Sequence, residues 1–395
     1  MKRPLARRAF PALFAALLLL PGPPAAAAPE EPYEITSILS LAGPVAFTGR
    51  AMAQTLHVIE GMVNASGGIQ GHPLRINVLD DQSSPQIAVQ LANGAVAAKS
   101  AVILGPGFAS TCLALQALIA ANGPVEYCFS PAIRPARGGY LFSASISGDD
   151  QAKGFLRFFR ARHWNRVAFL STTDATGQSY DRSFAYLMAL PENRSLISVA
   201  HENFSASDIS ITAQLERVKA AKPDVVIAAC SGAPFGTVVH GAFDTGLGLP
   251  IATLFSNMTF AQMDQYKAFL PETLLFAGPR SMSPTGTSAG PVRDAQQRYF
   301  AAFKAAGVRP DSGNNLAWDG TWIVIDALRH LGVKATASQV RDYIDNLHGW
   351  VGANGVYDFG DSEQRGIGIN GLLIERWDPA TRSFLAIARP GEGPN

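Results

Sequence analysis

Short apolar runs rich in β-branched residues alternate with longer helix-forming stretches along most of this chain. The alternation predicts right-handed βαβ units, in which parallel strands form a sheet and helices cover both of its faces. It starts with a strand over 35–41 and a helix over 51–64, and it restarts with a strand over 166–170. Two such series in 395 residues predict two doubly wound α/β lobes with parallel sheets. Further strands are expected over 74–79, 101–104, 124–129, 195–200, 224–228, 251–254 and 274–276, and further helices over 85–98, 111–121, 150–162, 177–189, 209–221, 235–246, 260–269, 292–306 and 316–330.

The first 28 residues have the features of a leader rather than of the folded protein. Basic residues near the start precede an apolar run over 9–20, and Ala26-Ala27-Ala28 follows a proline-rich turn. This order is typical of a secretory signal peptide. The apolar run is shorter than the ~20 residues that a membrane-spanning helix needs. We therefore expect residues 1–28 to be a signal peptide that is cleaved near Ala28 during export.

Charge and motif spacing argue against several classes of function. The formal net charge is +1, so the composition gives no strong electrostatic case for nucleic-acid binding. The seven histidines show no zinc-ligand spacing, and no Gly-x-Ser-x-Gly elbow of a hydrolase occurs. The segment 105–110 looks superficially like a dinucleotide loop, but it lacks the third glycine and does not follow the first strand. We expect no metal, no cofactor and no nucleic-acid partner.

Three stretches are more specific than a generic α/β pattern. They are Leu-Ala-Gly-Pro-Val-Ala at 41–46, Asn-Ala-Ser-Gly-Gly-Ile-Gln-Gly-His-Pro-Leu at 64–74, and Asp80-Asp81 followed by Pro85. In this order and spacing they resemble the leucine/isoleucine/valine-binding family of periplasmic solute-binding proteins, which serve ABC importers. The resemblance covers 33–390 and includes Ile103-Leu104-Gly105-Pro106, Ser130-Pro131-Ala132 and Trp318-Asp319-Gly320.

The resemblance implies the type I periplasmic binding fold, whose two lobes exchange the chain three times. One lobe is expected to contain 33–146 and 279–356, and the other 147–278 and 357–395. A ligand would lie between the lobes, and rotation about the hinge would bury it. The crossovers are expected near 143–148, 278–281 and 356–360.

The function implied by the resemblance is transport rather than catalysis. A periplasmic monomer would bind a small carboxylate and deliver it to an ABC permease in the inner membrane. Two alternatives stay open at this point. One is a secreted α/β enzyme such as a hydrolase, and the other is a ligand-presenting subunit for a membrane sensor.

The loop that opens the helix after the third strand carries Ser110 and Thr111, which resemble family ligand contacts. Their hydroxyl groups and the free amides of a helix start can hold a carboxylate, although a plain N-cap would use the same residue types. Near Asn257 the leucine-type proteins supply a carboxylate for the ligand ammonium, and a neutral amide cannot replace it. Arg134 is either a second partner for the carboxylate or a solvated loop residue. The positions expected to bind the ligand are Thr48, Ser110, Thr111, Ala132, Ile133, Ser231 and Asn257.

Five phenylalanines fall at or next to predicted strand ends, where a ligand would bind. Together with the neutral Asn257, they favour a small aromatic or branched carboxylic acid over leucine. The five are Phe47, Phe108, Phe129, Phe235 and Phe255.

The chain has three cysteines, and an exported protein folds in an oxidising compartment. Cys112 begins the helix after the strand that ends at Leu104, and Cys128 ends the following strand, so both are expected at one edge of one lobe. Cys230 is expected in the other lobe. One interpretation is a Cys112–Cys128 disulfide, and the other is three free buried thiols.

Overall fold

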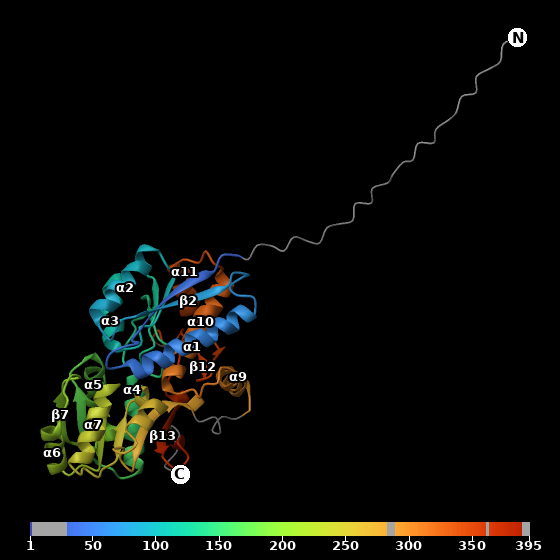
Figure 1. Cartoon of the computed structure of the whole chain (residues 1–395). Coiled ribbons are helices and arrows are strands. Elements are labelled where there is room, and N and C mark those ends of the chain that lie inside the picture. Colours follow the sequence, from blue (N-terminus) through green and yellow to red (C-terminus); the bar gives the residue numbers. More distant parts are fainter. Residues whose placement is uncertain (2–29, 283–288, 361–362, 389–395) are drawn as a thin grey trace.

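The computed structural model describes residues 1, 30–282, 289–360 and 363–388, which form two lobes (Figure 1). The expected signal peptide with its cleavage site near Ala28, and the last seven residues of the chain, lie outside the described residues. Within the described ranges, no helix combines the length and apolar character that crossing a membrane would require.

The first lobe is built on a five-stranded parallel sheet in the order β2-β1-β3-β4-β5. The blue and cyan helices α1 to α3 belong to this lobe, and the orange α10 and α11 join it from late in the sequence (Figure 1). Its strands are β1 (Tyr33–Leu39), β2 (Leu74–Asp80), β3 (Val102–Leu104), β4 (Val125–Tyr127) and β5 (Leu141–Phe142). Its helices are α1 (Ala46–Ala65), α2 (Pro85–Ala97), α3 (Ala109–Ile119), α10 (Ser312–Leu331) and α11 (Ala337–Asp345).

The second lobe is built on a seven-stranded mixed sheet in the order β14-β13-β10-β9-β8-β6-β7. The strands from β6 to β10 are parallel, and β13 and β14 add an antiparallel edge. The strands are β6 (Arg166–Thr172), β7 (Ile197–Phe204), β8 (Val225–Ala229), β9 (Ile251–Thr253), β10 (Leu274–Pro279), β13 (Leu372–Asp378) and β14 (Ser383–Ala388). The helices are α4 (Gly148–Ala161), α5 (Ala175–Met188), α6 (Thr212–Ala220), α7 (Ala233–Asp244) and α8 (Phe260–Gln265). Helix α9 (Pro291–Ala305) and the small hairpin of β11 (Trp350–Val351) and β12 (Val356–Tyr357) follow β10.

The prediction of two α/β lobes is confirmed, with two corrections. The second sheet is not wholly parallel, because β13 and β14 form a hairpin at its edge. The helix expected over 260–269 ends at Gln265, because the chain turns there and the Phe269 ring packs against His240 at 3.7 Å between centroids. The exact lobe boundaries stay a prediction.

Asp319 on α10 fixes the last crossover to the first lobe. Its buried carboxylate accepts hydrogen bonds from the backbone N–H groups of Ala353 (2.8 Å) and Asn354 (2.9 Å) and from the Tyr357 hydroxyl (2.9 Å). Burial raises the pKa of Asp319, and these three donors counteract the rise. The segment that leads from β11 to β12 is therefore held directly against α10.

Arg365 fixes the same late segment to the first crossover. Its side chain is 3% exposed and donates to the Ser143 hydroxyl (3.1 Å) and to the carbonyls of Ser145 (2.5 Å) and Ile133 (2.6 Å). These acceptors belong to the end of β5 and to the loop after β4. One buried guanidinium thus connects both crossovers to a loop at the carboxyl end of the first sheet.

We predict that Arg365→Met destabilises the protein, because it leaves buried acceptors without donors. The expected loss is about 3 kcal/mol, which lowers Tm by roughly 6–12 °C. Arg182→Met on α5 is the control, since Arg182 is exposed, and it should leave Tm within about 2 °C of the wild type. Differential scanning calorimetry compares the two variants. Equal Tm values for both would contradict the role given to Arg365.

Candidate functional site

The carboxyl ends of the parallel strands in the two sheets face each other across the lobe boundary. The backbone N–H of Ala233, after β8, donates to the Pro44 carbonyl, after β1, at 2.8 Å. The Thr48 hydroxyl donates to the Ser256 carbonyl at 3.1 Å. Ligands of α/β proteins bind outside the carboxyl ends of the strands, so the loops that meet here form the candidate site.

The conformation described has the lobes in direct contact, and α10 contributes to that contact. Asp311 is the N-cap of α10, accepts from the Gly313 N–H at 3.0 Å, and also accepts from the Phe260 N–H of the second lobe at 3.3 Å. Burial raises the pKa of Asp311 to about 6, and the backbone donors oppose that rise. The Arg309 guanidinium lies 3.9 Å from the centroid of the Phe260 ring, which adds a cation–π interaction beside this hydrogen bond.

The start of α3 offers unpaired hydrogen-bond donors. The first bond of the helix runs from the Cys112 N–H to the Phe108 carbonyl at 2.9 Å, and Phe108 is an N-cap without a side-chain bond. No described residue accepts from the N–H groups of Ala109, Ser110 and Thr111. Such groups at the positive end of a helix attract an anion.

Ser110 and Thr111 differ in what their hydroxyl groups do. The Thr111 hydroxyl donates to the Phe108 carbonyl at 3.0 Å, within its own helix turn. The half-buried Ser110 hydroxyl has no hydrogen-bond partner in the described parts of the chain. Neither residue is the N-cap, so the plain-cap interpretation of these two residues does not hold. Ser110 therefore has a free hydroxyl, and Thr111 has a free amide.

Ala132 and Ile133 lie in the loop that follows β4, and both are buried. The Ala132 N–H donates to the Ser130 hydroxyl at 3.2 Å, and the Ile133 carbonyl accepts from Arg365. Their side chains are apolar, so they could contact the apolar part of a ligand but not its charged group. Sequence reasoning missed Arg365, because nothing in the sequence around a single arginine indicates which distant loop it will contact.

Asn257 and Ser231 are predicted site residues of the second lobe, and their side chains already form hydrogen bonds within that lobe. Asn257 donates to the Cys230 carbonyl (2.7 Å) and the Thr253 hydroxyl (2.9 Å), and it accepts from the Gly232 N–H (2.9 Å). Ser231 shares a hydrogen bond of 2.6 Å with the hydroxyl of Ser256, a residue that sequence reasoning missed. Asn257 thus fixes the shape of the β8–α7 loop.

Arg134 forms hydrogen bonds near the surface, whereas most of the five phenylalanines lie in the interior. The Arg134 guanidinium donates to Asp149 at 2.6 Å and to the Ser183 hydroxyl at 3.2 Å, so it is paired across the lobe boundary rather than only solvated. Phe47 is half-buried. The other four rings are buried: Phe108, Phe129, Phe235 and Phe255.

Comparison with known proteins settles the family. The sequence profile of the periplasmic binding protein family matches residues 32–381, nearly all of the described chain. The chain belongs to the periplasmic binding protein family. A curated relative, the Leu/Ile/Val-binding protein BraC3 of Rhizobium johnstonii, is 27% identical over 197 residues, which are 48% of this chain and 52% of BraC3. The match therefore spans about half of the length of that relative.

Solved structures of periplasmic binding proteins share the fold at low sequence identity. The branched-chain amino acid transporter substrate binding protein LivJ of Streptococcus pneumoniae, in complex with isoleucine, has a TM-score of 0.73 at 18% identity, over 90% of this chain and 98% of LivJ. A solute-binding protein of an ABC transporter from R. palustris, in complex with benzoate, has a TM-score of 0.74 at 15% identity, over 90% and 96% of the chains. The expected type I fold is confirmed.

We predict that Gly232→Ala prevents the lobes of this periplasmic binding protein from closing fully. Gly232 has a φ of +76°, and an added Cβ would lie 2.3 Å from the Pro44 carbonyl oxygen of the other lobe. Small-angle scattering should show a larger radius of gyration for this variant than for the wild type. Gly246→Ala is the matched control, because Gly246 has a φ of +57° but its Cβ would approach only Lys219, at 3.8 Å. A Gly232→Ala protein as compact as the control would contradict the prediction.

Proposed function

We propose that this periplasmic binding protein captures a small organic carboxylate between its lobes and delivers it to an ABC permease of the inner membrane. The observation that carries the proposal is the set of unpaired N–H groups at Ala109, Ser110 and Thr111, beside the free Ser110 hydroxyl. These donors match the two oxygens of a carboxylate. The protein would act as a periplasmic monomer that holds and releases its ligand unchanged.

The second lobe supports a ligand without an ammonium group. Asn257 is uncharged and its amide is fully used within its own lobe, so it cannot neutralise a buried ammonium. The two structural neighbours bind isoleucine and benzoate, which share a carboxylate, and only isoleucine adds an ammonium. We therefore propose an aromatic or branched acid.

The remaining predicted residues would complete the pocket around the body of the ligand. Ala132 and Ile133 would form an apolar wall of the pocket in the first lobe, where both are already buried. Thr48, Ser231 and Asn257 would shape the closed boundary through their contacts around Ser256 and Gly232.

The proposed ligand class is tested by isothermal titration calorimetry with benzoate, 4-methyl-2-oxopentanoate, leucine and benzamide. We expect at least one of the two acids to bind more tightly than leucine, because Asn257 is uncharged and its amide is already bonded within the second lobe. Benzamide has the ring of benzoate without its charge, and it should bind at least tenfold more weakly than benzoate. Tightest binding by leucine would contradict the absence of an ammonium site, and equal binding of benzamide would contradict the carboxylate site.

The different roles of the two hydroxyl residues give a second test of the site. Ser110→Ala should weaken binding of the tightest acid by about 5- to 150-fold, since a buried anion loses a donor worth about 1–3 kcal/mol. Thr111→Val keeps the backbone N–H and removes a hydroxyl that already donates to Phe108, so its affinity should stay within about threefold of the wild type. The opposite order of effects in calorimetry would contradict this geometry.

A further inference from the structure

Glu126, in the middle of β4, is a buried carboxyl group with no hydrogen-bond partner. Its side chain has no exposed surface, and neither carboxyl oxygen has a partner among the described residues. Its neighbours in the sheet are Ile103 on β3 and Leu141 on β5, both apolar. Burial raises the pKa of Glu126 well above its ordinary range. A polar group left unpaired in a core costs free energy, so its position needs an explanation.

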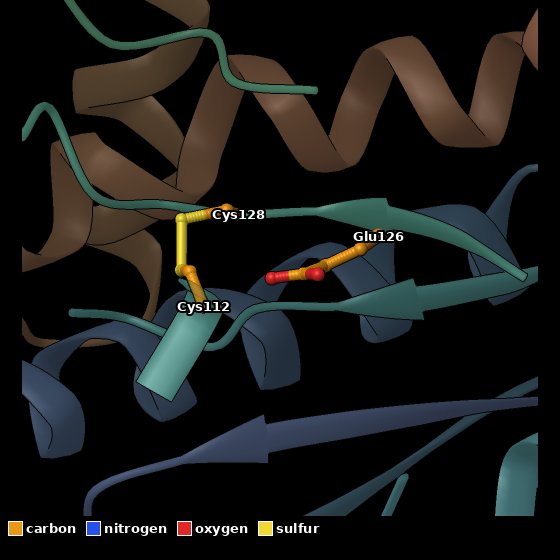
Figure 2. Close-up of side chains that lie close together, drawn as sticks. All are labelled: Cys112, Glu126 and Cys128. Carbon is orange, nitrogen blue, oxygen red and sulfur yellow. A yellow bond between two sulfur atoms is a disulfide. The ribbon is translucent and has the colours of Figure 1, made fainter. Parts of the chain in front are cut away.

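Glu126 lies beside the two cysteines of the first lobe. Figure 2 shows its carboxyl group directed toward Cys112 and Cys128, whose sulfur atoms are bonded to each other. A carboxyl oxygen and both sulfur atoms lie within 4.8 Å of one another. Cys128 directly follows β4 and lies two residues after Glu126, so the alternation of the strand directs both side chains to the same side. Cys112 comes from the first turn of α3.

We propose that in the dithiol form of the protein Cys112, Cys128 and Glu126 bind one thiophilic divalent cation such as Zn²⁺. Two thiolates and one carboxylate are ligands that Zn²⁺ prefers, with Zn–S near ~2.3 Å and Zn–O near ~2.0 Å. Ligand atoms of one ion then lie at most about 4.6 Å apart, and the three atoms here all lie within 4.8 Å of one another. The unpaired carboxyl of Glu126 supplies the oxygen ligand.

The surroundings of the cluster fit a bound cation with thiolate ligands. The Ser130 N–H lies 3.3 Å from Cys128 Sγ and can donate to a thiolate. The Pro106 carbonyl oxygen also lies 3.3 Å from Cys112 Sγ. Three anionic ligands around a divalent ion carry one net negative charge, which the positive end of α3 stabilises. The spacing of Cys112, Glu126 and Cys128 matches no sequence motif, because the sheet brings them together.

The experiment uses the full mature chain with Cys230→Ser, so that the only thiols are those of the cluster. A phosphine breaks the S–S bond and becomes a phosphine oxide, and each sulfur takes up a proton from water. After anaerobic removal of the phosphine, Co²⁺ is titrated as an optical probe, and Zn²⁺ affinity follows from competition with a chelating dye. We expect one ion per chain and sulfur-to-cobalt charge-transfer bands, which appear only when thiolates ligate the ion.

Variants separate a ligand from a merely structural residue. Glu126→Gln should weaken Zn²⁺ binding at least tenfold and change the cobalt spectrum, because one ligand is replaced. The oxidised protein and Cys112→Ser/Cys128→Ser should bind no ion. Circular dichroism and melting curves of each reduced protein are recorded alongside. The proposal is overturned if the reduced protein loses its fold, if it takes up no Co²⁺, or if Glu126→Gln matches its parent in Zn²⁺ affinity and cobalt spectrum.

Discussion

The buried guanidinium of Arg365 is the interaction on which the arrangement of the lobes depends. It comes from a segment that leads into the edge strands of the second sheet, yet its hydrogen bonds end on Ser143, Ser145 and Ile133 around the first sheet. Asp319 supports the same junction by accepting three hydrogen bonds from 353–357. Because a buried charge is stable only when its partners are in place, these two residues fix the crossovers and, through Ile133, a loop of the proposed site.

The two lobes that meet at this junction differ in the hydrogen-bonding groups that they present to the proposed site. In the first lobe, the N–H groups at the start of α3 lack acceptors among the described residues. In the second lobe, Asn257 already forms hydrogen bonds with the backbone of the loop between β8 and α7. The asymmetry supports the proposed selectivity, since the first lobe offers donors to an anion and Asn257 offers no charge to an ammonium group. Contacts such as Pro44 with Ala233 then determine how closely the lobes can approach.

Much of the fold could be predicted from the sequence, because parallel strands and their crossover helices leave a strong periodic pattern. Strands such as β2 and β8 were expected within a residue or two of their observed bounds. The edge strands β13 and β14 were not expected, because they belong to a hairpin outside the βαβ repeat.

The candidate site was less predictable, because hydrogen bonds between distant residues decide what each side chain does. Sequence reasoning selected Ser110 and Thr111 together, and only the tertiary structure separates a free hydroxyl from one bonded to Phe108. Likewise, Glu126 belongs to an ordinary strand in the sequence, and only the sheet places it beside Cys112 and Cys128.

A crystal structure of the complex with the tightest-binding acid of the panel tests the central claim most directly. We expect the carboxylate oxygens to lie within about 3.2 Å of the N–H groups of Ser110 and Thr111 and of the Ser110 hydroxyl. The lobes should meet through the contact between Pro44 and Ala233. A carboxylate bound away from the start of α3, with those N–H groups left to solvent, would contradict the account.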